Sequence, residues 1–227
     1  MFTPYDWQEG IGNRAQYIEN KLAQGSPVIA VSLSRGILVF TYRRQARKIF
    51  EIYDRIVFAG IGQQSDVEAL RIAALEFASK EGYNRSEEDV TIQRVATGLT
   101  APLKKAFSDF SASPFVARTF FAEVNDTPDQ DLYYTLDYDG DYAVSHQSAV
   151  ISGSHEHSDA ILKKLEGFDA ATEPDAAIEL LKHAWATPVS EDDDIASRLD
   201  GLSPEAVLVE RSNAREDRFR MLIQEEF

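Results

Sequence analysis

Two clusters in this sequence carry side chains of the kinds that bind metal ions. The first is His155-Glu156-His157 with Asp159, and the second is the acidic stretch Glu191-Asp-Asp-Asp194. Two histidines spaced by one residue at a helix start point away from each other, unlike helical zinc ligands spaced by four. The acidic stretch lacks the alternating oxygen ligands and the glycine of a calcium loop. We therefore interpret the first as a helix cap with a solvated polar face and the second as a solvated loop. No metal and no cofactor is expected.

The strongest basic run is Arg43-Arg44-Gln45-Ala46-Arg47-Lys48, in a chain whose net charge is −15. It joins two predicted β-hairpins, and its simplest interpretation is a solvated connection between them. The acidic balance of the chain argues against a nucleic-acid partner, because phosphate contacts need a basic surface. It favours partners with basic patches.

The amino-acid composition further narrows the class of protein. Cysteine is absent, which excludes disulfides, thiolate zinc sites and a cysteine nucleophile. No segment approaches the roughly 18 consecutive apolar residues that a membrane span requires. The first ten residues lack the basic lead and apolar stretch of a secretory signal. We expect one soluble cytoplasmic domain over residues 1–227, with a well-buried core and no membrane partner.

The candidate site residues must be positioned by helices and strands, which are expected in separate groups along the sequence. A helix is expected over 5–24, where apolar residues recur at helical spacing and Gly25 supplies a stop signal. With no earlier element to pack on, this helix is expected to serve an interface. The strands are expected at 28–33, 37–41, 48–53, 55–62, 115–124, 132–137, 142–144, 149–153, 206–211 and 219–223. The later helices are expected at 65–81, from about 86 to 107, at 155–166 and at 175–186.

The order of these elements predicts the fold class. Strands and helices in separate groups argue against a doubly wound parallel sheet. Two antiparallel sheets between helix layers would bury each strand on both faces, which accounts for runs such as 57–61 with little polar alternation. The third helix is expected to begin at Ser86-Glu87-Glu88-Asp89, where a hydroxyl cap and an acidic first turn suit the positive helix end. We therefore predict an α+β fold, a four-layer αββα sandwich.

The element order and several motifs resemble the N-terminal-nucleophile hydrolase fold, and proteasome subunits in particular. The segments that carry the resemblance are Gly25-Ser-Pro-Val-Ile-Ala30 with Gly36-Ile-Leu-Val39, Lys48-Ile-Phe-Glu-Ile-Tyr-Asp-Arg55 with Val57-Phe-Ala-Gly-Ile-Gly62, Leu136-Asp-Tyr-Asp-Gly140 and Val150-Ile-Ser-Gly153. They are similar to the family's opening hairpin, to its next hairpin with a landmark lysine, and to its later turn and helix start. The resemblance covers nearly the whole chain.

Proteasome subunits are of two types, and the residues near position 26 favour the non-catalytic one. Active β-type subunits expose a threonine nucleophile freed by cleavage after a glycine, and Ser26 follows Gly25 at the matching position. A serine hydroxyl with a free amine as base can attack a peptide carbonyl. However, Tyr42 replaces the expected acidic partner, and Pro27 puts a rigid ring beside the processing site. The resemblance therefore implies an α-type subunit of a bacterial core particle, with a self-processed hydrolase using Ser26 as the alternative.

The resemblance also implies roles for a basic pocket. Lys48 would pair with the C-terminal carboxylate of a ring ATPase activator, since a lysine is a mobile point charge with three donors. Arg47 would assist through its guanidinium fork. Gly62 would let the activator tail approach the backbone closely. In a β-type subunit the same lysine would lower the proton affinity of the nucleophile, so Lys48 alone does not separate the two types.

Further roles concern the gate and the pore. Residues 1–24 would comprise an N-terminal gate segment and its helix, the gate being formed by Phe2, Thr3, Pro4 and Tyr5. Pro114 and Phe115 would form a narrow pore ring, although Phe115 could instead be a core strand residue.

The partners implied by the resemblance are other α subunits in a ring, expected to be a heptamer, a ring of β subunits, and ATPase tails. A docked tail would shift the gate between closed and open states during protein degradation. A third possibility is a divergent homo-oligomer with neither β partner nor peptidase activity.

Overall fold

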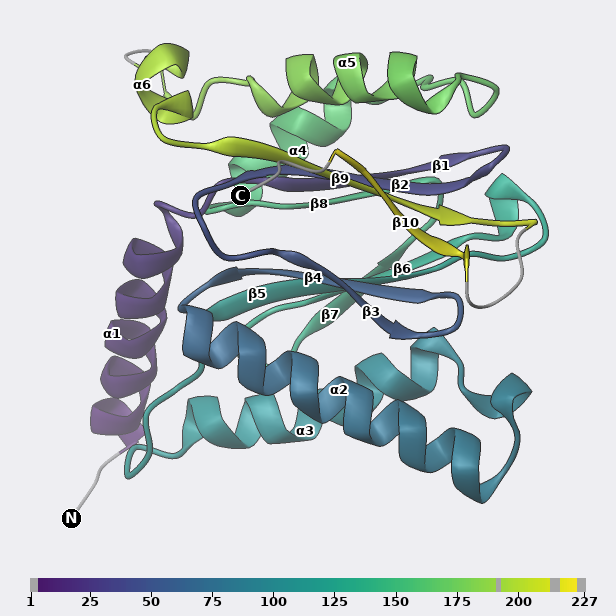
Figure 1. Ribbon diagram of the computed structural model, residues 1–227. Helices are drawn as coiled ribbons and strands as arrows, with labels where there is room; N and C mark the ends of the chain where they lie inside the picture. Colours follow the sequence, from purple (N-terminus) through teal and green to yellow (C-terminus); the bar gives the residue numbers. More distant parts are fainter. Residues whose placement is uncertain (1–3, 191–192, 213–216, 224–227) are drawn as a thin grey trace.

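Two stacked antiparallel β-sheets form the centre of the molecule, and helices cover both of their outer faces (Figure 1). The computed structural model describes residues 4–190, 193–212 and 217–223. From top to bottom, the layers in Figure 1 are α4 with α5, the first sheet, the second sheet, and α2 with α3. The predicted α+β fold, a four-layer αββα sandwich, is confirmed.

Each sheet contains five strands within the described residues. The first sheet has the spatial order β10-β9-β2-β1-β8, with β1 at Val28–Leu33, β2 at Gly36–Arg43, β8 at Ser148–Ile151, β9 at Ser203–Glu210 and β10 at Phe219–Ile223. The second sheet has the order β3-β4-β5-β6-β7, with β3 at Ile49–Tyr53, β4 at Ile56–Gly62, β5 at Ala117–Glu123, β6 at Leu132–Leu136 and β7 at Tyr142–Ser145. The basic run therefore connects β2 of one sheet to β3 of the other.

The helices are α1 (Pro4–Leu22), α2 (Gln64–Asn84), α3 (Ile92–Ser108), α4 (His155–Lys164), α5 (Pro174–Trp185) and α6 (Ile195–Leu199), with 3-10 turns η1 (Glu87–Asp89) and η2 (Pro128–Gln130). Helix α1 stands across one end of the sandwich rather than on a sheet face (Figure 1). It buries Ile18 and Leu22 in the core between the sheets, whereas Tyr5, Trp7 and Tyr17 are exposed.

The strands are apolar on both faces because each lies between two layers. In β1, Val28 and Ala30 belong to the core between the sheets, while Ile29, Val31 and Leu33 belong to the core under α4 and α5. A third core lies between the second sheet and the α2–α3 pair. The absence of polar alternation in β4, which the sequence analysis used, follows from this double burial.

Several sequence predictions of where elements begin and end are wrong, and three of them bear on the argument. The second helix of the first pair does not begin at Ser86: residues 87–89 form η1, Val90 is buried in extended backbone, and α3 begins at Ile92. Strand β5 begins at Ala117 rather than at Phe115. Of the predicted acidic loop, residues 191 and 192 lie outside the described part of the chain, and Asp194 caps α6, a helix that the sequence analysis did not predict.

In the described ranges, none of the helices combines the length with the apolar character that a membrane span needs.

Candidate functional site

A cavity of about 560 Å³ opens at the end of the sandwich where α1 joins β1. Its walls come from the segment 23–27, the basic run, the end of β4, the β8–α4 turn and the end of α5. Lys48 and Gly62, both predicted as site residues, line this cavity together with Ser26. The structure therefore brings together residues that are as much as 36 positions apart in the sequence.

Lys48 is directed at the start of β1. Its Nζ donates to the backbone oxygen of Ser26 at 3.1 Å and also to the Ser26 hydroxyl. Burial lowers the pKa of the Lys48 ammonium to about 8, and the carboxylate of Glu205 opposes that shift. The side chain is thus charged at neutral pH and can be neutralised by a modest rise in pH.

Glu205 on β9 fixes the backbone at Lys48. Its carboxylate, of which only 1% is exposed, accepts from the main-chain N–H of Lys48 at 3.0 Å and of Ile49 at 3.4 Å. Arg43 and Arg47 lie 3.7 and 3.6 Å from the same carboxylate. A buried acid at position 205 therefore balances the basic run, a feature that sequence reasoning did not find because 157 residues separate it from Lys48.

Arg47 lies on the Glu205 side of the basic run, and Arg44 lies on the cavity side. The guanidinium of Arg47 lies beside Glu205 and over the ring of Phe50, 5.7 Å from its centre, and the residue is not part of the cavity lining. Arg44, Ala46 and Lys48 line the cavity at alternate positions. Residues 44–46 form bends rather than extended chain, so no regular spacing in the sequence would have indicated Arg44.

Gly62 lines the cavity, but its own chain already requires a glycine there. Its φ is +123°, and a Cβ at this position would lie 2.1 Å from the backbone oxygen of Val116. The close approach seen here is thus between β4 and the start of β5. Approach of a partner's tail to Gly62 remains a prediction.

The cavity is basic although the chain is acidic. Its charged lining residues are Arg44, Lys48 and Arg198, with His157 beside them, and no Asp or Glu belongs to the described lining. Arg198 is held by the Asp193 carboxylate at 2.6 Å and lies over the Trp185 ring. Burial lowers the pKa of His157, whose Nε2 faces the Thr187 carbonyl at 2.9 Å. An anionic ligand suits this lining.

Ser26 is hydrogen-bonded in a way that does not prepare it for attack. Its hydroxyl donates to the Tyr42 carbonyl at 2.5 Å while accepting from Lys48. A lysine acting as general base would instead have to receive the serine proton. The Tyr42 ring packs against Phe40 and Trp185, with centroids 5.2 and 4.7 Å away, and does not take the place of an acid.

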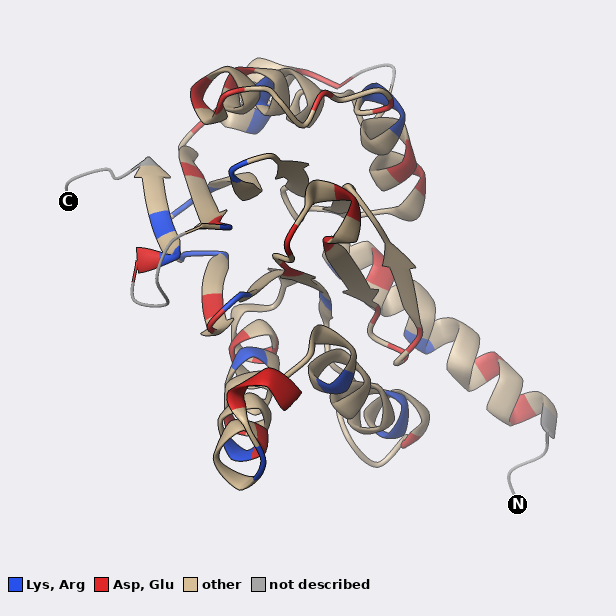
Figure 2. Ribbon diagram, turned by 90° about the vertical axis from the view of Figure 1, so that its right-hand side faces the viewer, with Lys and Arg blue, Asp and Glu red and all other residues tan. Residues whose placement is uncertain are grey.

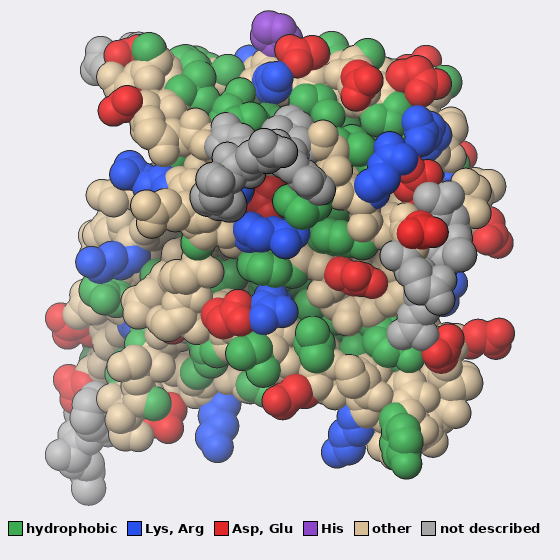
Figure 3. All heavy atoms as spheres, in the orientation of Figure 1, with side chains coloured by type: hydrophobic (Ala, Val, Ile, Leu, Met, Phe, Trp, Pro, Cys, Tyr) green, Lys and Arg blue, Asp and Glu red, His purple; other side chains and the backbone are tan. Residues whose placement is uncertain are grey.

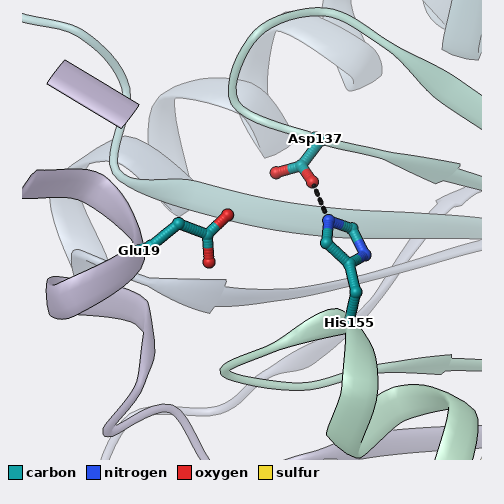
Figure 4. Close-up of side chains that lie close together, drawn as sticks. All are labelled: Glu19, Asp137 and His155. Atoms are coloured by element: carbon teal, nitrogen blue, oxygen red, sulfur yellow. Dashed lines mark ion pairs between the residues drawn. The ribbon is translucent and has the colours of Figure 1, made fainter. Parts of the chain in front are cut away.

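A second polar cluster joins α1, the β6–β7 turn and α4. Glu19, Asp137 and His155 offer ligand atoms within 4.8 Å of one another, and His155 Nε2 lies 2.9 Å from Asp137 (Figure 4). The guanidinium of Arg118 lies among them, with Nη2 3.0 Å from both carboxylates and 3.1 Å from His155. A positive charge of the protein itself already occupies the position that a cation would take.

The two histidines of the sequence cluster face different surroundings. His155 pairs with Asp137 and is mostly exposed, whereas His157 is buried against Thr187. Their separation agrees with the helical geometry from which the sequence analysis argued.

The predicted gate and pore residues remain predictions. Phe2 and Thr3 lie outside the described residues, α1 begins at Pro4, and Tyr5 is exposed. Pro114 and Phe115 precede β5, and Phe115 packs at the edge of the core between the second sheet and the α2–α3 pair.

The stacked antiparallel sheets between paired helices are the sandwich of the N-terminal-nucleophile hydrolase class. The chain belongs to the proteasome subunit family, whose model matches residues 24–197. It is 31% identical to the proteasome subunit alpha of Jonesia denitrificans, over 96% of this chain and 91% of that protein. It is 29% identical to the proteasome subunit alpha of Streptomyces avermitilis, over 100% of this chain and 89% of that protein. It is 34% identical to that of Acidothermus cellulolyticus, over 72% of this chain and 71% of that protein. The resemblance to bacterial α-type subunits that the sequence indicated is confirmed.

Proposed function

We propose that this chain is a non-catalytic α-type subunit of a proteasome core particle. Copies of it form an outer ring, expected to contain seven subunits, that stacks on β subunits and gates the entry of substrates. The Lys48 cavity receives the C-terminal carboxylate of a ring ATPase activator. The relatives named proteasome subunit alpha support the subunit type, and the cation-lined cavity supports the docking site.

One observation carries the docking proposal: three cationic side chains and no described carboxylate line a cavity in a chain of net charge −15. A terminal carboxylate needs a positive charge and donors that are held in place. Lys48 offers both, because Glu205 fixes its backbone and Ser26 orients its ammonium group. Arg44 at the same wall adds a second cation.

The cavity is also suited to control the gate. The segment 23–27, which links the end of α1 to the start of β1, forms part of its wall. A tail bound at Lys48 contacts this segment and therefore has different affinities for different positions of α1. Such a difference in affinity is what shifts a conformational equilibrium.

The experiment combines assembly with binding. Co-expression with the candidate β partner, followed by native mass spectrometry, should give a two-component ring containing the full-length chain. Peptide hydrolysis by that ring should rise when an ATPase-tail peptide is added. Lys48→Ala should abolish this rise. Losing a buried, charged hydrogen bond should lower the affinity for the tail about tenfold or more. Lys80→Ala on α2 should leave the rise unchanged. An equal response of the two variants would contradict the docking role.

The contact between Ser26 and Lys48 favours one alternative, a hydrolase in which cleavage after Gly25 exposes Ser26. Its test is the intact mass of the purified chain. A chain beginning at Ser26, with peptide hydrolysis lost in Ser26→Ala, would replace the α-type proposal. We expect the uncleaved mass, because the Ser26 hydroxyl donates to Tyr42 and no acidic partner lies beside it in the described structure.

A further inference from the structure

Arg118 is a buried arginine at the start of β5 that binds three other segments. Only 4% of its side chain is exposed. It donates to Asp137 in the β6–β7 turn, to the Ser152 carbonyl after β8 at 2.9 Å, and to Glu19 on α1 at 3.0 Å. The guanidinium group of Arg118 thus joins three separate segments to β5 through its hydrogen bonds.

One of these segments is a wall of the Lys48 cavity. Ser152 is followed directly by Gly153 and Ser154, which line the cavity. Gly153 is packed against the end of α1 so closely that a Cβ there would lie 2.8 Å from Ala23. The β8–α4 turn and the end of α1 therefore form a continuous surface. Arg118 binds the Ser152 carbonyl of the first and the Glu19 carboxylate of the second.

The middle of α1 is attached separately, to the loop that precedes β5. Arg14 donates to the Asp109 carbonyl at 2.8 Å and to the Ala112 carbonyl, and it lies over the ring of Phe110. Helix α1 thus has two polar attachments, one from Glu19 to Arg118 and one from Arg14 to the loop that leads to Pro114 and Phe115. A displacement at the cavity end reaches that loop through a single helix.

We propose that Arg118 is a positioning residue that ties α1 to the wall of the Lys48 cavity, so that a ligand in the cavity and α1 move as one unit. The proposal rests on the docking role of the cavity and adds how occupancy reaches the N-terminal helix. Glu19 is the α1 side of the connection.

The test changes Glu19 rather than Arg118, because removing a buried arginine would leave Asp137 uncompensated and could unfold the chain. Glu19→Ala is compared with Glu9→Ala, an exposed glutamate on the same helix, so that the gain in helix propensity is shared. Glu19 lies in the C-terminal half of α1, where a negative charge is unfavourable to the helix. Any loosening in Glu19→Ala therefore occurs despite that relief.

Hydrogen exchange of the full-length chain supplies the measurement. Amides at 17–22 should exchange about fivefold faster in Glu19→Ala than in the wild type, the effect of losing a partly exposed ion pair and its hydrogen bond. Glu9→Ala should leave their exchange unchanged. Equal exchange in the two variants would overturn the proposal.

A peptide probe tests the coupling itself. An eight-residue peptide with a free C-terminal carboxylate is compared with the same peptide amidated. The peptide with the free carboxylate should slow exchange at 17–22 in the wild type and in Glu9→Ala, but not in Glu19→Ala. It should still bind to Glu19→Ala with an affinity within about twofold of that for the wild type.

Binding of the peptide without any effect on exchange in α1 of the wild type would overturn the coupling. Indistinguishable binding of the two peptides to the wild type would instead contradict the docking role, and the ligand-free comparison would still decide whether Arg118 holds α1.

Discussion

Lys48 is an ammonium group that the fold partly withdraws from water, and its chemistry follows from that. Burial favours the neutral form and lowers its pKa to about 8, although Glu205 lies nearby. The cost of burial is not removed because Glu205 is already bound by backbone N–H groups and by Arg43 and Arg47. A ligand carboxylate beside the ammonium group would supply a counter-charge and so favour the charged form of Lys48.

The affinity of a tail peptide should therefore depend on pH. Below about pH 7 the Lys48 ammonium is present in the free protein, and the affinity is constant. As pH rises through 8 the ammonium is lost, so the affinity should fall and approach tenfold for each further pH unit. Isothermal titration calorimetry between pH 6.5 and 9.5 measures this decline.

Lys48→Arg is the control for this prediction, because a guanidinium stays charged throughout the range. Its affinity at pH 7 is expected to be lower, since the guanidinium fork differs in shape from an ammonium group, but it should not decline with pH above 8. A decline of equal slope in both proteins would assign the titration to another group.

The sequence predicted only some of the residues that line the Lys48 cavity. Lys48 and Gly62 follow from the resemblance of 48–62 to a family hairpin, and the structure brings both to one cavity. Arg44 was missed in favour of Arg47, because the side on which each arginine lies depends on Glu205, which comes from β9. Arg118 was missed altogether. Its partners are 99, 19 and 34 positions away, and no local pattern indicates such contacts.

At the scale of elements, local signals determined most of the helices and strands. The bounds of β1 match their prediction because Gly, Ser, Pro and Arg residues limit its apolar run on both sides. The start of α3 did not match its prediction. Ser86 and the three acidic residues after it have the sequence pattern of a helix start, but tertiary packing overrides that local preference. Val90 is buried in the core under the second sheet, and this holds the backbone extended until Thr91.

The cap of α3 gives a prediction at this scale. The Thr91 hydroxyl accepts from the Arg94 N–H at 3.4 Å, whereas Ser86 makes no such bond to the backbone. Thr91→Ala should therefore lower the free energy of unfolding by about 1 kcal/mol. Ser86→Ala should change it by less than about 0.5 kcal/mol, as for an exposed site outside a cap. Urea denaturation followed by circular dichroism measures both, and a larger loss in Ser86→Ala would restore Ser86 as the helix start.

At the scale of the whole molecule, the outstanding quantity is the net charge of −15. Acidic residues are spread over the outer helices and turns (Figure 2), and on the face drawn in Figure 3 basic side chains lie among acidic ones. Several basic side chains of the chain form ion pairs within it, such as Arg220 with Glu210 at 3.0 Å and Arg55 with Glu123 at 3.1 Å. Such pairs leave the acidic excess uncompensated, and like-charged copies brought together in a ring repel one another.

Salt should therefore promote the proposed ring. The screening length is about 14 Å at 0.05 M salt and about 4 Å at 0.5 M, so repulsion between neighbouring copies is strongly weakened over this range. We expect the protein concentration at which half of the chain is oligomeric to fall by roughly tenfold, as sedimentation velocity would show. Urea denaturation at each salt concentration separates this effect from a change in the stability of the subunit. Dissociation of the oligomer by salt would instead mean that ion pairs between copies outweigh the repulsion of their net charges, because direct pairs are what salt weakens.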